Sequence, residues 1–229
     1  ENIFNFKPGK KADIVRMPEI IKNADIHIKR SFTRGVFTFD GCVKTSGNVG
    51  LTTKSRSLLE DIKKVLDQDM INYKITYNRN KQAWNLESSS GRNKELLKKW
   101  EKYFFEDSVK FKKIKFFEGK LKINDIQSLN QLFPIHHHNK VSFREIYTAL
   151  NKIQKGEIRD LLQELRKNEI SVNNTTLYKW LYLLASSGLI SKKNYQVKTN
   201  NNAFQRTIYY LKREQDLINN ESILKNDNK

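Results

Sequence analysis

Polar side chains that could contact nucleic acid alternate with apolar ones along short strand-like runs. In 71–78, Ile71, Tyr73, Ile75 and Tyr77 point one way and polar residues point the other. Lys can read guanine, Asn can read adenine, and Thr is adaptable. The candidate DNA contacts are Lys44, Ser46, Thr52, Lys54, Asn72, Lys74, Thr76 and Asn78, with loop residues Arg79 and Lys81 reaching phosphates or an active centre. A plain solvated sheet face would alternate in the same way. Glu87, on a fourth strand, would repel phosphate, so that strand lies outside the footprint or Glu87 accepts a hydrogen bond from cytosine.

The charge of the chain favours a polyanionic partner. Its 229 residues carry 43 Lys and Arg against 25 Asp and Glu, a formal net charge of +18. Such an excess repels itself unless nucleic acid, or less plausibly an anionic membrane surface, neutralises it. No run approaches the roughly 20 apolar residues of a membrane-spanning helix, and residues 1–11 do not resemble a secretory signal. We therefore expect DNA rather than a membrane as partner, and an intracellular location, cytoplasmic or nucleoid-associated.

Metal and nucleophile chemistry has few other sources in this sequence. The single cysteine, Cys42, allows neither an internal disulfide nor a thiolate zinc site, which fits a reducing compartment. The run His136-His137-His138 has no acidic or cysteine ligand nearby, and we interpret it as a solvated linker. No glycine-rich phosphate loop and no Ser-His-Asp arrangement is found.

The elements that must position these residues follow from periodicity and caps. Asp25 is a plausible N-cap for a helix over about 26–39, and two strand-like runs, 42–46 and 49–54, flank the turn signal Gly47-Asn48. A helix over about 58–67, the strand 71–78, a strand marked by Trp84 and Leu86, and a basic amphipathic helix around Leu96 and Trp100 follow. The order is α-β-β-α-β-β-α. Residues from about 107 form a basic hairpin or helix packed on this module, and then a linker.

The run Thr33–Gly41 (TRGVFTFDG) closely resembles the signature of LAGLIDADG homing endonucleases, often written L-R-G-L-F-D-x-D-G. Arg34, Gly35, Phe37, Asp40 and Gly41 match it, and Val36 is a close substitute. The resemblance extends over roughly residues 8–105, including the segment 10–19 before the helix. It implies that two such helices pack along one another, here through Ile28, Phe32 and Gly35.

The resemblance also implies a catalytic role for Asp40, as a ligand of Mg²⁺ in phosphodiester hydrolysis. A lysine near the sheet, Lys81 or Lys74, would stabilise developing charge. Thr38 replaces the earlier acidic residue of the motif, which in the family mainly supports local structure. The alternative is that Asp40 only caps a turn before a hairpin.

One motif supplies only half of such a site. The second LAGLIDADG half would be a homodimer copy or a segment upstream of Glu1, and the segment 10–19, similar to a connector before a second half, favours the upstream arrangement.

The C-terminal third predicts a winged helix: two helices over 143–153 and 157–167, a third over 175–187, then strands 191–197 and 205–211. Its candidate DNA contacts are Thr175, Thr176, Tyr178 and Lys179 on the third helix and Lys192, Lys193, Lys198 and Arg206 on the wing. A protein-binding winged helix is the alternative.

The expected fold class is α+β: a LAGLIDADG-type half-domain with an antiparallel DNA-binding sheet over 1–120, a linker over 121–140, a winged helix over 141–212 and a flexible tail over 213–229. The expected function is site-specific binding of double-stranded DNA with Mg²⁺-dependent cleavage, as part of a LAGLIDADG homing endonuclease. A non-cleaving transcription regulator with a degenerate LAGLIDADG module, and a maturase-like RNA binder, are the alternatives.

Overall fold

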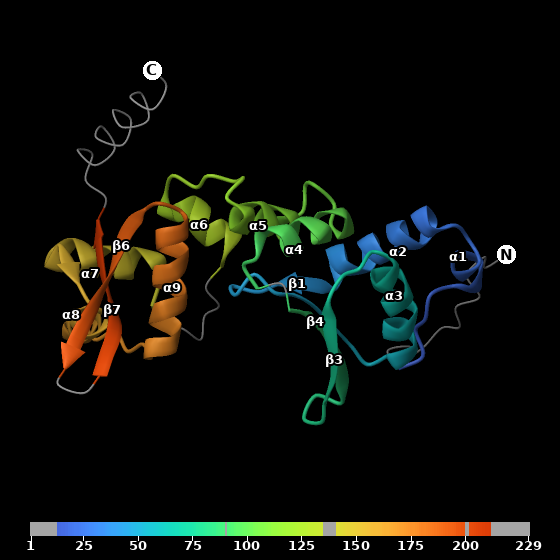
Figure 1. Ribbon diagram of the computed structural model, residues 1–229, viewed down its shortest axis with the longest axis horizontal. Coiled ribbons are helices and arrows are strands. Elements are labelled where there is room, and N and C mark those ends of the chain that lie inside the picture. Colours follow the sequence, from blue (N-terminus) through green and yellow to red (C-terminus); the bar gives the residue numbers. More distant parts are fainter. Residues whose placement is uncertain (1–12, 90, 135–140, 200–201, 212–229) are drawn as a thin grey trace, which may run out of the picture. The chain divides into compact units, whose positions relative to one another are not determined.

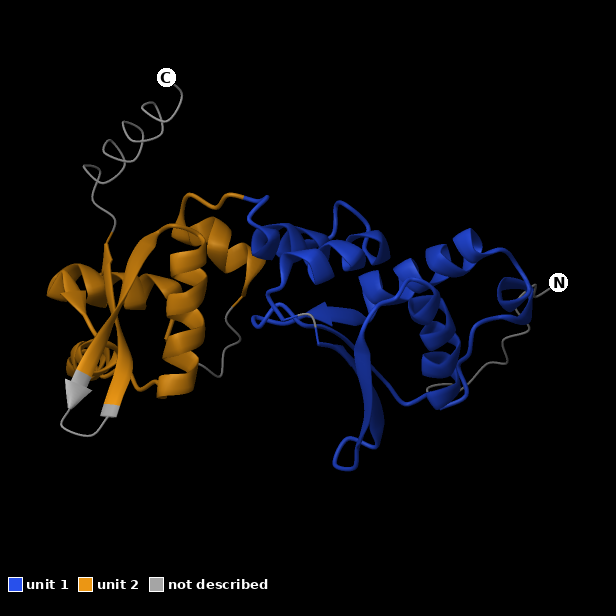
Figure 2. Cartoon of the chain, in the orientation of Figure 1, with its two compact units in different colours: residues 1–121 blue, residues 122–229 orange. Residues whose placement is uncertain are grey.

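The computed structural model describes residues 13–89, 91–134, 141–199 and 202–211. The chain divides into two compact units, residues 1–121 and residues 122–229 (Figure 2). The expected tail over 213–229 and the histidine run at 136–138 lie outside the described residues. No helix in the described ranges has the length and apolar character needed to cross a membrane.

Unit 1 has the expected order of elements and is an α+β fold with an antiparallel sheet (Figure 1). The elements are α1 (Glu19–Lys22), α2 (Ile26–Phe39), β1 (Gly41–Val43), β2 (Val49–Thr53), α3 (Arg56–Gln68), β3 (Tyr73–Asn78), β4 (Ala83–Ser88), α4 (Lys94–Trp100), the 3-10 turn η1 (Glu101–Tyr103) and α5 (Val109–Glu118). The first strand is shorter than expected, because the chain turns after Val43 and Gly47 adopts a positive φ of 84°. Of the two forms expected after about residue 107, the helix is the one observed, as α5, which packs on α4 and β1.

The four strands form one sheet in the order β1-β2-β4-β3, with every neighbouring pair antiparallel. One face of the sheet is apolar, and Val49, Leu51 and Leu86 on it are at most 2% exposed. Helices α2 and α3 pack against this side of the sheet, as Figure 1 shows. The opposite, polar face is left uncovered by these two helices.

An aromatic cluster fixes α2 to the C-terminal part of unit 1. Phe37 is fully buried, and its ring centroid lies 5.1 Å from that of Trp100, 6.0 Å from Tyr103 and 6.1 Å from Phe104. Large-to-small changes at such a site typically cost about 3–5 kcal/mol. The helix itself begins where expected, because the Asp25 carboxylate accepts hydrogen bonds from the backbone N–H groups of His27 and Ile28.

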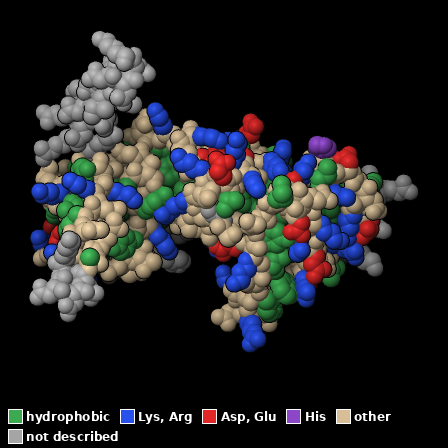
Figure 3. All heavy atoms as spheres, viewed as in Figure 1, with side chains coloured by type: hydrophobic (Ala, Val, Ile, Leu, Met, Phe, Trp, Pro, Cys, Tyr) green, Lys and Arg blue, Asp and Glu red, His purple; other side chains and the backbone are tan. Residues whose placement is uncertain are grey.

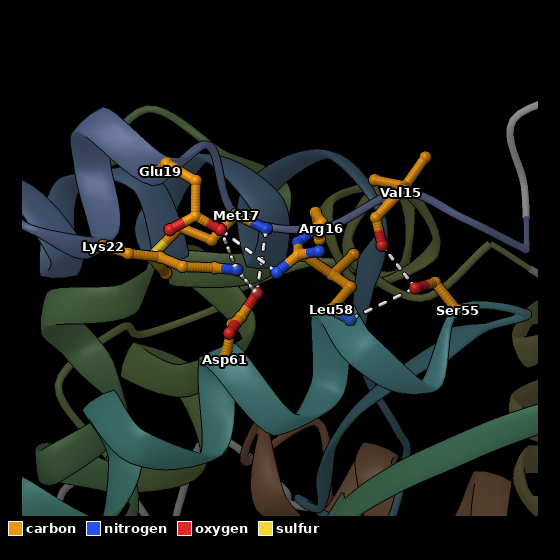
Figure 4. Close-up of polar contacts among 8 residues, drawn as sticks. All are labelled: Val15, Arg16, Met17, Glu19, Lys22, Ser55, Leu58 and Asp61. Atoms are coloured by element: carbon orange, nitrogen blue, oxygen red, sulfur yellow. Dashed lines mark hydrogen bonds and ion pairs between the residues drawn. The ribbon is translucent and has the colours of Figure 1, made fainter. Parts of the chain in front are cut away.

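The segment that precedes α1 is tied to α3 by side chains of α3 and its cap (Figure 4). The Ser55 hydroxyl donates to the Val15 carbonyl and accepts from the Leu58 backbone N–H at 3.1 Å, which also caps α3. Asp61 accepts from the Met17 backbone N–H at 3.1 Å and pairs with Lys22 at 3.2 Å. These contacts hold the start of the described chain, including the fully packed Met17, on the module.

Unit 2 contains α6 (Ile126–Leu132), α7 (Phe143–Ile153), β5 (Lys155–Gly156), α8 (Ile158–Lys167), α9 (Asn174–Ser186), β6 (Ile190–Thr199) and β7 (Asn202–Leu211). Its strands form a sheet in the order β5-β7-β6. The prediction of a linker over 121–140 was wrong for 126–132, where Asp125 caps α6 and Leu129 and Leu132 are buried. The two-residue strand β5 was missed because a pair of residues has no periodicity to detect.

Candidate nucleic-acid interface

Helix α2 has one buried side and one uncovered side. Thr33 and Phe37 are fully buried against the rest of unit 1. On the other side, Ile28 is 48% exposed and Phe39 is 76% exposed, and a methyl group built on Gly35 would meet no atom within 4 Å. We call Ile28, Phe32, Gly35 and Phe39 the α2 ridge. Phe39 meets the edge of the Phe105 ring, with centroids 6.3 Å apart, but the exposed Ile28 and the open space at Gly35 are not explained by contacts within the unit.

Asp40 stands at the end of the α2 ridge as the C-cap of the helix. Its backbone N–H donates to the Val36 carbonyl at 2.8 Å, and its side chain is exposed. Gly41 must follow, because a Cβ there would lie 2.5 Å from the Phe37 carbonyl oxygen. Thr38 has a local role, since its hydroxyl accepts a hydrogen bond from the Phe105 backbone N–H at 3.0 Å.

Lys110 of α5 lies at the end of α2, next to Asp40. Its Nζ donates to the carbonyls of Thr38 at 2.6 Å and Phe39 at 2.8 Å, the last carbonyls before Asp40. Burial lowers the pKa of Lys110 below its usual value, partly opposed by the charge of Asp40. Burial likewise lowers the pKa of Lys113 on the same helix. Sequence reasoning missed Lys110 because 70 residues separate it from Asp40 and nothing local marks it.

Lys81, predicted as a catalytic residue, lies exposed near the tip of the β3–β4 hairpin. The sheet register places Gly41 in one row with Leu51 and Leu86, whereas the last row before the hairpin tip pairs Asn78 with Ala83. At about 3.3 Å per residue, these two rows are roughly 10 Å apart along the strands. The fold therefore does not bring Lys81 to Asp40, whereas Lys110 lies at the end of α2.

The polar face of the sheet gathers part of the predicted DNA-contacting set. Strand alternation and register place Lys74, Thr76 and Asn78 on it together with Thr52, while Lys44 directly follows β1. Ser46 was wrongly placed on a strand, since it lies in the tight turn between β1 and β2. Lys54 follows the end of β2 and Asn72 precedes β3, and both are exposed. The prediction missed Asn85, whose side-chain oxygen accepts from the Thr52 hydroxyl at 2.8 Å in the middle of this face.

The charges on this face are mostly basic and without acidic partners. Within the described residues, no ion pair is recorded for Lys54, Lys74, Arg79 or Lys81. Figure 3 shows Lys and Arg side chains at the tip of the β3–β4 hairpin. Glu87 is the acidic residue among them, and it pairs with Lys44 at 2.5 Å.

In unit 2, the predicted contacts on α9 share its solvent side. Thr175, Tyr178 and Lys179 are exposed and Thr176 is half-buried. Trp180, whose side of the helix the sequence left ambiguous, is 8% exposed and packs edge-on against Phe143 at 4.9 Å.

The predicted wing residues differ in whether their side chains are free to contact DNA. Lys192 and Lys193 are exposed on β6, and the Lys192 ammonium lies 5.5 Å from the Tyr182 ring centroid. Arg206 is engaged internally, because its Nη1 lies 3.3 Å from each Glu157 oxygen. Releasing it to a phosphate would break that pair. The side chain of Lys198 lies outside the described residues.

A second carboxylate near α2, Asp69, has a structural arrangement quite unlike that of Asp40. It accepts from Arg30 Nε at 3.1 Å and Nη2 at 2.5 Å, from the Tyr103 hydroxyl, and pairs with Lys102 at 2.8 Å. Burial alone would raise its pKa, but the hydrogen bonds from Arg30, Lys102 and Tyr103 hold the pKa at about 2. Asp69 therefore locks α2, α3 and η1 together, while Asp40 remains available.

No cluster of three or more His, Cys, Asp or Glu side chains in the described part of the chain could hold a metal ion. Asp40 could offer a carboxylate oxygen to Mg²⁺, which usually takes only one or two protein carboxylates and completes its six ligands with water and phosphate oxygens.

Comparison with known proteins supports the sequence resemblance over part of unit 1. Residues 27–100, from the first turn of α2 to the end of α4, match the LAGLIDADG-like domain family. We found no significant match of the chain to a curated protein or to a solved structure. The segment containing the α2 ridge, Asp40 and the four-stranded sheet is therefore similar to a LAGLIDADG-like domain.

Proposed function

We propose that this protein binds duplex DNA site-specifically through the polar face of its unit 1 sheet. We further propose that it pairs with a second LAGLIDADG half along the α2 ridge and cleaves phosphodiester bonds there. The observation that carries the proposal is that the uncovered ridge ends in an exposed carboxylate beside the ammonium of Lys110. A ridge that packed against its counterpart would bring two Asp40 carboxylates, or Asp40 and its equivalent, close to one axis.

In this paired state, Asp40 provides one ligand for Mg²⁺ and the second half provides another. A bound Mg²⁺ supplies charge neutralisation at the phosphate and a more acidic water. Lys110 uses two of its three donors on the carbonyls of Thr38 and Phe39, which leaves one N–H for a phosphate oxygen. Its reduced pKa follows from burial, and the nearby Asp40 charge favours the protonated form that this role requires.

For unit 2, we propose a winged helix that adds DNA contacts. The order α7-β5-α8-α9-β6-β7 and the exposed side of α9 support this reading. Thr175, Tyr178 and Lys179 would face the major groove and Lys192 and Lys193 would contact phosphates. Arg206 is excluded from this set as long as it pairs with Glu157.

A non-cleaving DNA-binding regulator is the second candidate, favoured by one observation. Thr38 stands where the family motif has an acidic residue that mainly supports local structure, so the support beside Asp40 departs from the family pattern. In that case binding persists and no phosphodiester bond is cut.

The test compares the full chain with Asp40→Asn on a randomised duplex library, first in Mg²⁺ and then in Ca²⁺, under conditions where two halves pair. Asp40→Asn keeps the shape but removes the charge, so cleavage in Mg²⁺ should fall by at least about a hundredfold while binding in Ca²⁺ persists or tightens. The matched control is Asp13→Asn, an exposed carboxylate that lies on neither the α2 ridge nor the sheet. Cleavage that survives Asp40→Asn would refute the catalytic role, and a paired wild type that binds but cuts no sequence would leave only the regulator.

A further inference from the structure

An acidic residue sits in the middle of the face that is proposed to approach DNA. Glu87 lies on β4, one of the two central strands, between Gly50 of β2 and Lys74 of β3 in the sheet register. Its side chain is 38% exposed, so it is presented to solvent rather than buried in a core. A carboxylate at this position repels phosphate, so its presence on a DNA-binding face requires a group that it binds specifically.

The Glu87 carboxylate is held in place from both sides. Lys44 Nζ lies 2.5 Å from Oε2, and Asn48 Nδ2 donates to Oε1 at 2.9 Å. Asn48 is itself oriented, because its Oδ1 accepts from the Gly91 backbone N–H at 2.7 Å. These hydrogen bonds, from Lys44 first and Asn48 second, lower the pKa of Glu87, so the group stays ionised at neutral pH.

The Lys44 side chain crosses a neighbouring strand to reach Glu87. Lys44 follows β1, and β2 lies between β1 and β4, so the side chain must pass over β2. It passes over Gly50, where an added Cβ would be in ordinary contact with Lys44 Cε at 3.9 Å and in a tighter contact with Cys42 Sγ at 3.3 Å.

Stability is a weak explanation for this pair. The Lys44 side chain is 46% exposed and that of Glu87 38%, and ion pairs this exposed contribute little to folding. What the pair does present is a donor and an acceptor, side by side and fixed in position, on a surface otherwise rich in Lys, Asn and Thr.

This donor–acceptor order matches the major-groove edge of a G·C pair. Guanine presents the acceptors N7 and O6, and cytosine presents the N4 amino donor beside O6. Lys44 can donate to guanine while Glu87 accepts from cytosine. A T·A pair presents the same acceptor–donor order, with Lys44 on thymine O4 and Glu87 on the adenine amino group. The reversed pairs C·G and A·T fit poorly, because they place an amino donor against the Lys44 ammonium and a carbonyl acceptor against the Glu87 carboxylate.

We propose that Lys44 and Glu87, positioned by Asn48, read a single base pair of the target and accept G·C or T·A over the reversed pairs C·G and A·T. The proposal rests on the proposed DNA-binding function and specifies one position of the target. Lys74, the cross-strand neighbour of Glu87, forms no ion pair with the residues that the structure describes. Lys44, Glu87 and Lys74 together therefore carry a net positive charge, which favours the approach of phosphates.

The experiment selects bound duplexes from a randomised library with the full chain, in Ca²⁺ so that no strand is cut. Wild type is compared with Glu87→Gln, with the charge-swapped double variant Lys44→Glu/Glu87→Lys, and with the control Glu60→Gln. Glu60 pairs with Arg56 on α3 and is exposed, so its change removes the same charge away from the polar face. Melting temperatures establish that each variant is folded.

Wild type and Glu60→Gln should share one position at which G·C or T·A is preferred over C·G and A·T by about 5- to 150-fold. Glu87→Gln should lose at least about fivefold of this preference at that position alone, because its amide cannot accept from Lys44, Asn48 and a base amino group together. The swapped pair should invert the preference at that position, from G·C or T·A to C·G or A·T.

Identical selected sites for wild type, Glu87→Gln and the swapped variant would overturn the reader and leave DNA binding intact. Failure of the wild type to bind any duplex in a salt-dependent way would overturn both proposals. If Glu87→Gln does not fold, the sites selected by the charge-swapped variant decide whether the proposal stands, because this variant keeps an ion pair between positions 44 and 87.

Discussion

Protonating or removing Asp69 should destabilise unit 1 in a pH-dependent manner. The folded-state pKa is about 2 against an ordinary value of 3.8, and each unit corresponds to about 1.4 kcal/mol, so the ionised carboxylate contributes roughly 2 kcal/mol at neutral pH. Because the folded pKa is depressed, this contribution is fully present above pH 3.8 and is lost as the pH falls toward 2. Asp69→Asn should therefore lower the free energy of unfolding by roughly 2–3 kcal/mol at pH 7. The partners Arg30 and Lys102 have side chains 29% and 41% exposed, so water can solvate them and the loss stays moderate.

The assay is chemical denaturation from pH 7 to pH 2 with and without Asp69→Asn, in a background that carries Trp84→Phe and Trp180→Phe. In that background the fluorescence comes from Trp100, which contacts Phe37 and Tyr103 in the same cluster. The difference between the free energies of unfolding of the two proteins should decrease as the pH falls below 4. Glu60→Gln, at an exposed pair on α3, should cost less than about 1 kcal/mol and change little with pH. If the loss of unfolding free energy caused by Asp69→Asn stays constant down to pH 2, the linkage argument is refuted. If that loss is near zero at pH 7, the contacts of Asp69 with Arg30, Lys102 and Tyr103 do not stabilise the fold.

The remaining predictions concern binding and organisation. Log affinity for duplex DNA should fall linearly with log salt, by about 0.9 per phosphate neutralised, and a slope near zero would count against the DNA-binding proposal. Ile28→Asp should prevent pairing of two halves in sedimentation experiments while changing the stability of the unpaired unit little, because Ile28 is already 48% exposed; unchanged pairing would show that the α2 ridge is not the interface. A chain ending at Leu121 should melt cooperatively and bind DNA more weakly than the full chain, and a non-cooperative melt would show that unit 1 depends on unit 2.

Local patterns were enough to predict the order of elements in unit 1. The cap at Asp25 and the alternation along β3 each act within a few residues, and both appear in the structure, the alternation from Tyr73 to Thr76. The same local signals failed where a segment is short or mixed in composition. The helix α6 has only seven residues, and its burial depends on the rest of unit 2 rather than on its own pattern.

Which residues share the candidate site depended on tertiary structure much more than the order of the elements did. The sequence identified Asp40 through its motif, but the lysine beside it comes from α5, and the predicted Lys81 lies at a hairpin tip instead. Likewise, the sequence marked Glu87 as a carboxylate out of place, and only the strand order β1-β2-β4 brought Lys44 across Gly50 to neutralise it. Periodicity determines which face a residue occupies, whereas the register between strands and the docking of α5 determine which distant side chains share that face. Those pairings are decided by the packing of the whole core, and no local spacing encodes them.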